Sequence, residues 1–312
     1  MFSINAVAPL FAVLLLGYVL KRINFLNDAF ISVGNKVVFY VALPASLFMS
    51  VYSVDVGGLL DWRFATFVVS ASIIGFVSIW FISSFFIKDK KILGAFTQGA
   101  FRGNFVFLGM PLLINIAGAI GEVRAALIMA FVLPVYNICA VLLLASCSDS
   151  DSDKKVDIRA IIYSILTNPF IIAIFLALSL QLLDINLPFV IERTIRYPAN
   201  MATALALICL GAGMNFQGFD KRFKYALIAS MIKVILMPVV FVAVGYAVGF
   251  RDYDIAAILI LGGIPSAIAG YVMVVQMGGD GYIASTIVVI STFLSAFTLT
   301  LYIYILRIIN LI

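Results

Sequence analysis

Ten long apolar stretches, each long enough to cross a lipid bilayer as a helix, constrain this chain more than any other feature. A spanning helix needs about 20 mostly apolar residues, and these runs lack the alternation of membrane β-strands. The stretches are residues 4–20, 33–51, 62–87, 92–117, 125–146, 161–183, 190–214, 225–248, 255–277 and 283–308. The sequence therefore predicts an all-α integral membrane protein with ten transmembrane helices.

The composition fits a chain that is surrounded by lipid. Apolar residues make up 64% of the 312 residues and charged residues 11%, whereas a soluble domain is about 45–50% apolar and about 25% charged. The chain has no histidine, so it lacks the commonest general base and metal ligand. Its three cysteines lie far apart and are predicted to be free thiols. We therefore expect no enzyme, no metal site and no cofactor.

Lys and Arg residues collect on one side of the predicted membrane. When the ten stretches are threaded back and forth, twelve of these residues fall on one side and six on the other. Loops rich in Lys and Arg usually stay in the cytoplasm. They also account for the net charge of +5 without a nucleic-acid partner. The expected protein is a multi-pass protein of the cell membrane with both termini outside the cytoplasm.

A polar segment, residues 147–158, divides the ten stretches into five and five. Its serines, aspartates and lysines are typical of a solvated linker. Because each half has an odd number of spans, the second half enters the membrane from the opposite side, as in inverted repeats. The sequence predicts a first five-helix repeat in residues 1–146, a cytoplasmic linker, and an inverted second repeat in residues 159–312.

The fourth stretch carries helix-breaking residues at its centre. Arg102, Gly103 and Asn104 occupy that centre, and Gly109 and Pro111 follow them. Glycine frees the backbone, while proline removes a hydrogen-bond donor and clashes with the preceding turn. A break inside the membrane is tolerated where it packs in protein or lines a cavity. We therefore expect an interrupted helix here.

The ninth stretch has a matching pattern. Its centre and the residues after it hold Gly262, Gly263, Pro265, Ser266 and Gly270. An offset of 161 residues aligns Asn104 with Pro265. Interrupted helices at equivalent places in two halves point to a transport site. The alternative is that these residues only make packing kinks.

Two basic residues remain in the predicted membrane interior. Arg102 and Lys233 each lie near the middle of a stretch, whereas all fifteen acidic residues can be placed in loops or at stretch ends. A charge inside the membrane is costly and is usually functional. Half-helix N-termini and the amide of Asn104 also suit an anion. The sequence predicts a site for a small organic anion, although Lys233 could equally cap backbone carbonyls.

The segment NFVFLGMP resembles the signature of the auxin efflux carrier family, which includes plant auxin carriers and bacterial malate- or malonate-permease-like proteins. The shared pattern is Asn104, Gly109 and Pro111. The segments LLLGYVLKRINFLN and LPASLF and the ten-span length are also similar to that family. Auxin carriers have proline where this chain has Gly103 and glutamine where it has Ser266. The resemblance therefore does not imply auxin itself.

The resemblance implies two inverted five-helix repeats whose helices four and nine cross at their breaks, as in the bile-acid-transporter-like architecture. Helices 1, 2, 6 and 7 would form a scaffold, often dimeric, and helices 3–5 and 8–10 a transport domain that moves like an elevator. It also implies that Asn104 contacts the substrate and that Pro265 and Ser266 mark the second crossing.

The expected function is secondary active transport of small organic anions, such as malate, malonate or auxin-like acids, by elevator-type alternating access. A sodium-coupled symporter of bile-acid-like anions and a membrane receptor without transport are the alternatives. The expected substrate-binding residues are Arg102, Gly103, Asn104, Lys233, Pro265 and Ser266, with helix breaks at Gly109, Pro111, Gly262, Gly263 and Gly270.

Overall fold

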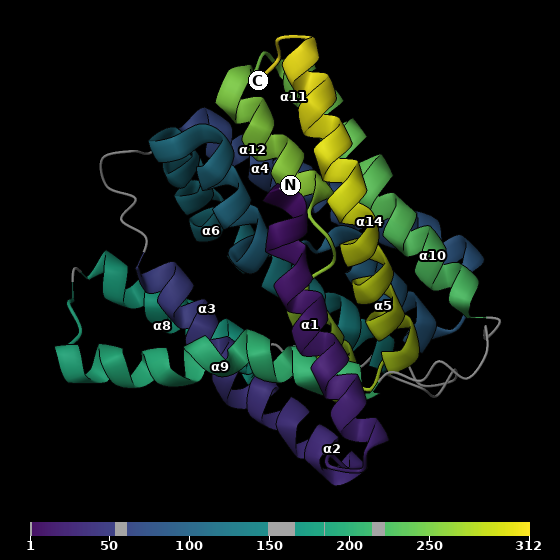
Figure 1. The fold of residues 1–312 in the computed structure, drawn as a ribbon. Helices are drawn as coiled ribbons and strands as arrows, with labels where there is room; N and C mark the ends of the chain where they lie inside the picture. The colour runs from purple at the N-terminus through teal and green to yellow at the C-terminus, as the bar shows by residue number, and fades with distance from the viewer. Residues whose placement is uncertain (1, 54–60, 149–165, 184, 214–221) are drawn as a thin grey trace.

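The computed structural model describes residues 2–53, 61–148, 166–183, 185–213 and 222–312 (Figure 1). These residues form helices joined by short connections, and no β-strand occurs among them. The prediction of an all-α fold is therefore confirmed. The predicted linker between the two halves lies, from residue 149 onward, outside the described residues.

Five of the described helices begin at a capping side chain. The α-helices are α1 (Phe2–Arg22), α2 (Asp28–Val37), α3 (Leu43–Tyr52), α4 (Trp62–Phe86), α5 (Lys90–Phe101), α6 (Met110–Ser148), α8 (Pro169–Leu182), α9 (Phe189–Gly213), α10 (Phe223–Met231), α11 (Met237–Val248), α12 (Asp252–Gly263), α13 (Ile268–Gln276) and α14 (Gly281–Ile308). The π-helical segments are η1 (Val38–Ala42), η2 (Phe105–Gly109) and η3 (Ile232–Leu236). A capping side chain accepts a hydrogen bond from a backbone N–H in the first turn, which the helix itself leaves unpaired. The capping residues are Asn27, Asp61, Asp89, Asn168 and Asp280.

Within the described residues, six continuous helical segments are long and apolar enough to cross a membrane, so the chain is a multi-pass membrane protein. They are Asp28–Tyr52, Trp62–Phe86, Phe105–Cys147, Phe189–Gly213, Phe223–Val248 and Gly281–Ile308. The predicted fourth and ninth stretches are each interrupted: α5 ends at Phe101 and α12 ends at Gly263. The chain resumes a helical path at Phe105 and Ile268.

Helix α6 consists of two pieces that meet at Gly118. This residue has φ 56° and ψ −134°, a conformation that costs a residue with a side chain about 1–3 kcal/mol. The predicted fourth and fifth stretches are therefore joined by a turn within α6. The position needs glycine for its backbone angles rather than for space, because a Cβ there would have no atom within 4 Å.

Two groups of helices can be distinguished by their packing. In the first group, α9 packs against α1, α2, α3 and η1, and α3 also packs against α8. The second group comprises α4, α5, α6, α10, α11, α12 and α14. Figure 1 shows α1 crossing α9 and α3 lying between α8 and α9, while α11 and α12 lie toward the opposite end of the molecule and α14 runs between the two ends. Helix α13 contacts both groups.

Helices α1 and α9 approach each other through two glycines. A Cβ at Gly17 would overlap the carbonyl oxygen of Ile208, and one at Gly211 would overlap that of Leu14. Small residues allow membrane helices to bring their backbones together, which increases van der Waals contact. This close crossing fixes the position of α9 relative to α1.

The outer surface of the helices is apolar. Large exposed side chains include Phe81 and Phe86 on α4, Phe175 on α8 and Phe297 on α14. A soluble monomer rarely leaves so much apolar surface in water. These side chains therefore face the hydrocarbon of the bilayer.

An ion-pair cluster joins three helices at one end of the second group. The guanidinium of Arg124, on α6, lies 3.0 Å from the carboxylate of Asp61 and 2.6 Å from that of Asp254, on α12. The same guanidinium lies 4.7 Å from the ring centroid of Phe64, on α4. The pKa of Asp61 is lowered, chiefly because the N–H of Phe64 donates to its carboxylate, and Arg124 lowers it further.

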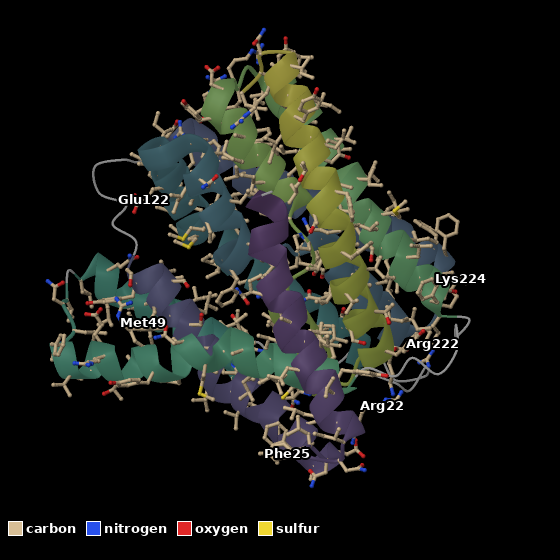
Figure 2. All side chains as sticks on the ribbon, in the orientation of Figure 1. Arg22, Phe25, Met49, Glu122, Arg222 and Lys224 are labelled. Carbon is tan, nitrogen blue, oxygen red and sulfur yellow. The ribbon has the colours of Figure 1, made fainter. Side chains whose placement is uncertain are left out.

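Basic side chains lie together at another end of the molecule. Figure 2 shows Arg22, Arg222 and Lys224 toward the same side, away from the chain's C-terminus and from Glu122. Arg222 forms an ion pair of 2.8 Å with Asp280 at the start of α14. All three basic residues belong to the set that the sequence places in the cytoplasm, and the orientation itself stays a prediction.

Candidate functional site

The two interrupted helices meet at their breaks. Gly103 lies opposite Ser266 in a short antiparallel pairing. The N–H of Asn104 donates to the carbonyl of Pro265 over 2.9 Å, and the N–H of Ala267 donates to the carbonyl of Arg102 over 3.0 Å. These hydrogen bonds satisfy backbone groups that a bilayer could not hydrate. The break is therefore built into the fold as a crossing of two extended segments.

Local sequence explains why the chain leaves the helix at these points. A residue before proline is pushed to the extended region, and Ile264, which precedes Pro265, has φ −62° and ψ 148°. Gly103 allows the two segments to approach, because a Cβ there would lie 2.6 Å from Cγ1 of Ile264. The N–H of Ser266 donates to Oγ of Ser291, on α14, over 3.0 Å.

Lys233 binds the end of α12 next to the crossing. Its side chain is fully buried in η3, and its Nζ donates to the carbonyl of Gly262 over 2.6 Å and to that of Leu261 over 3.4 Å. These carbonyls lie in the last turn of α12, where the helix dipole is negative. A Cβ at Gly103 would lie 3.3 Å from Nζ. The ammonium therefore caps α12 next to the crossing, and a direct substrate contact stays a prediction.

Arg102 carries a buried positive charge at the crossing. Its side chain is 6% exposed, and its Nη2 donates to Oδ1 of Asn137, on α6, over 2.9 Å. Its Nη1 lies 2.8 Å from the sulfur of Met273, on α13. Among the ion pairs of the described residues, none includes Arg102. Its described partners are therefore neutral, and no carboxylate in the described part of the chain pairs with it.

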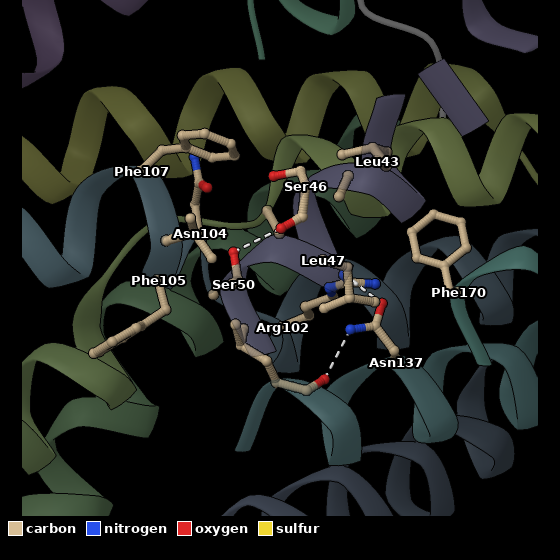
Figure 3. Close-up of a pocket in the computed structure, with 15 residues that line it drawn as sticks. Leu43, Ser46, Leu47, Ser50, Arg102, Asn104, Phe105, Phe107, Asn137 and Phe170 are labelled. Carbon is tan, nitrogen blue, oxygen red and sulfur yellow. Dashed lines mark hydrogen bonds between the residues drawn. The ribbon is translucent and has the colours of Figure 1, made fainter. Parts of the chain in front are cut away.

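A cavity of about 50 Å³ lies against the crossing (Figure 3). This volume has room for about three to five water molecules. Its lining residues are Leu43, Ser46, Leu47, Ser50, Arg102, Gly103, Asn104, Phe105, Val106, Phe107, Leu133, Asn137, Phe170, Ala267 and Ala269. The crossing thus forms one wall, and α3, α6 and α8 form the others.

Asn104 occupies a central place in this wall. It is 5% exposed, and its side chain makes no capping hydrogen bond to η2. Asn104 lines the main cavity and also a second space of about 10 Å³. Leu207 of α9 and Thr292 of α14 line this second space as well. The hydrogen bond to Pro265 fixes the backbone of Asn104, and the residue lines both the main cavity and the smaller space.

The predicted site residues are not all brought together. Arg102, Gly103 and Asn104 line the cavity, whereas Pro265 and Ser266 lie at the crossing but outside the lining. The predicted break residues also differ in position. Gly262 and Gly263 end α12, Gly109 ends η2, Pro111 lies in the first turn of α6, and Gly270 lies inside α13. Proline is tolerated in a first turn because its missing N–H is not needed there.

Sequence reasoning missed several lining residues. Ser46 and Ser50 come from α3, Asn137 from α6 and Phe170 from α8. Ser50 donates from Oγ to the carbonyl of Ser46 over 2.8 Å. The available signals were the LPASLF segment, which contains Ser46, and the polar amide of Asn137 within an apolar stretch.

Comparison with known proteins shows the family of this chain. The model of the family described as membrane transport protein matches residues 2–303. The chain belongs to this family, the auxin efflux carrier family. The predicted resemblance is thus confirmed, and members of this family are transporters rather than enzymes.

Relatives of the family cover nearly the whole chain. An "Uncharacterized transporter" of Methanothermobacter thermautotrophicus is 26% identical over 96% of this chain and 97% of its own length. A "Putative malonate transporter" of Rhizobium meliloti is 26% identical over 96% of this chain and 95% of its own. The "Uncharacterized transporter YfdV" of Escherichia coli is 24% identical over 99% of both chains. This membrane transport protein therefore has a bilayer and a transported substrate as partners.

Proposed function

We propose that this chain is a secondary active transporter of small organic anions, chiefly short carboxylates, and that they bind in the cavity at the crossing. The observation that carries the proposal is the buried guanidinium of Arg102, which lines that cavity with neutral described partners. An unbalanced buried charge is costly. An anion in the cavity offsets that cost.

The rest of the lining suits a carboxylate. Arg–carboxylate hydrogen bonds are charge-assisted and geometrically specific. The amide of Asn104 and the hydroxyls of Ser46 and Ser50 add neutral hydrogen-bonding groups to the lining. The small volume favours an anion of a few carbon atoms over a bile acid or another bulky anion. One relative carries the name "Putative malonate transporter", and malonate is an anion of this size and charge.

The helix packing supports an elevator-type mechanism. We propose ten spans in two inverted five-helix repeats, with the first helix group (α1, α2, α3, α8 and α9) as scaffold and the second as transport domain. The cavity lies where the two groups face each other, because α3 and α8 line it on one side and the crossing on the other. A sliding movement of the second group would carry a bound anion past the scaffold.

Uptake into proteoliposomes tests this function. Labelled malonate, malate, lactate and taurocholate would be compared, with imposed proton and sodium gradients in separate arms. We expect saturable uptake of a short carboxylate and none of taurocholate. Sodium-dependent taurocholate uptake would instead support the bile-acid-like symporter, and specific binding without uptake of any anion would indicate a receptor.

Arg102→Gln makes the test specific to the site. Loss of a charge-assisted hydrogen bond, worth about 1.5–3 kcal/mol, predicts a fall of about 10- to 100-fold in uptake efficiency. The matched control is Arg196→Gln, because Arg196 is an exposed arginine on α9 that pairs with Glu192. Equal uptake by wild type and Arg102→Gln would overturn the assignment of the cavity.

A further inference from the structure

A second, larger cavity shares no lining residue with the one at the crossing. Its volume is about 320 Å³, which is at the lower end of the range of ligand pockets, about 300–1,000 Å³. Residues of α11 and of the end of α14 line it, together with Leu259 of α12. Its lining residues are Pro238, Val239, Val242, Ala243, Tyr246, Leu259, Tyr302, Ile305, Leu306, Ile309 and Leu311.

This cavity opens toward lipid. Val239, Tyr246 and Ile305 line it and are 50%, 45% and 41% exposed. Two of the membrane-spanning segments, Phe223–Val248 and Gly281–Ile308, carry these residues. Water gains little in a space whose lining is aliphatic and aromatic, and an empty space forfeits the dispersion contacts of its walls. Hydrocarbon is therefore the material that suits this space.

A cationic group lies at the mouth of the cavity. The guanidinium of Arg251 lies 3.8 Å from the ring centroid of Tyr246, a lining residue. Its Nη1 donates to the carbonyls of Tyr246 and Phe250 over 2.8 and 2.6 Å, and the residue is exposed. Tyrosines of this kind mark the level of the lipid headgroups. The fixed guanidinium is thus placed where a headgroup phosphate would lie.

A second guanidinium lies at the same helix end. Nη2 of Arg63 donates to the carbonyl of Val248, the last residue of α11, over 2.8 Å, and Arg63 is exposed. The acidic residues nearby are the exposed Asp252 and the pair Asp61 and Asp254. That pair already binds Arg124. Neither Arg63 nor Arg251 takes part in an ion pair among the residues that the structure describes.

We propose that this cavity is a phospholipid site, with one acyl chain between α11 and α14 and the headgroup phosphate on Arg251 and Arg63. The acyl chain fits because the walls are apolar and open to the bilayer. The phosphate fits because guanidinium groups bind phosphate through charge-assisted hydrogen bonds. The site is independent of the proposed transport cavity.

Native mass spectrometry and phosphate analysis of the detergent-purified full chain test this proposal. The probe is phosphatidylglycerol, compared with phosphatidylcholine and with a fatty acid of the same chain length. Ala243→Phe fills the cavity and is expected to lower phospholipid retention about tenfold, because burial of a few methylene groups is lost. Val244→Phe is the matched control, since Val244 is exposed on the same helix but does not line the cavity.

The headgroup contact is tested separately. The double variant Arg63→Gln, Arg251→Gln is expected to bind phosphatidylglycerol about tenfold more weakly. Equal retention by Ala243→Phe and Val244→Phe would overturn the acyl-chain site. Binding of the fatty acid as tight as that of phosphatidylglycerol, unchanged in the double variant, would overturn the phosphate contact.

Discussion

The backbone N–H of Asn104 donates a 2.9 Å hydrogen bond to the carbonyl of Pro265, which lies in the other half of the chain. This bond fixes the backbone of a residue whose side-chain amide lines the cavity. The bond therefore fixes the point on the backbone from which the amide extends, and it involves no side-chain atom. A substitution of the side chain leaves this backbone bond in place, so function and folding can be tested separately here.

Asn104→Ala is expected to lower transport at least tenfold with little change in thermal stability. The lost side chain removes a hydrogen-bonding group from the cavity wall, while the bond to Pro265 is kept. Uptake in proteoliposomes and the unfolding temperature of the same preparation measure the two effects. Normal uptake by the well-folded variant would remove Asn104 from the site.

Lys233→Met is expected to lower stability by about 1–3 kcal/mol, because the carbonyls of Leu261 and Gly262 lose their cap. Lys233→Arg keeps the charge and serves as the comparison. Unfolding in a detergent titration gives the stability, and binding of a carboxylate to the remaining folded protein gives the affinity. Unchanged stability with weaker anion binding would favour the substrate contact over the cap.

Gly118→Ala is expected to destabilise the protein by about 1–3 kcal/mol, because alanine tolerates φ 56° and ψ −134° poorly. The matched control is Gly270→Ala. Gly270 is helical, and its added Cβ would meet Gln98 at an ordinary 3.4 Å. A detergent titration compares the two variants with wild type. If both variants lost equal stability, backbone strain at Gly118 would not be the cause.

Because the pKa of Asp61 is lowered, we expect the protein to lose stability in acid. Its pKa is lower in the folded protein than in the unfolded chain, so its contribution is present above the unfolded pKa, about 3.9. That contribution is lost as the pH falls through the folded pKa. Unfolding temperatures measured between pH 7 and pH 3 should fall at the acidic end. Asp61→Asn should be less stable at pH 7 and show a smaller acid-dependent fall.

The sequence allowed the crossing to be anticipated, because its determinants are local. Pro265 forces Ile264 out of the helix, and Gly103 removes the side chain that would obstruct the approach. Arg102 could be singled out because a charge in an apolar stretch is rare. These signals are carried by residue type alone.

The other walls of the cavity could not be anticipated in the same way. Ser46, Ser50 and Asn137 reach the cavity because α3 and α6 pack beside the crossing, and a helix face is chosen by tertiary packing. The sequence predicts a connection between residues 117 and 125, and the turn lies there, but the sequence did not single out Gly118 as the residue that makes it, since its backbone angles could not be read from residue type.

The crossing itself is held by main-chain atoms. Because the donors and acceptors at Arg102, Asn104, Pro265 and Ala267 belong to the backbone, most residue types at these positions could form the same bonds. Evolution can therefore exchange the side chains that face the cavity, and with them, under the proposed function, the anion that is selected, while the framework stays intact. One backbone framework of this kind can therefore serve carriers of many different solutes.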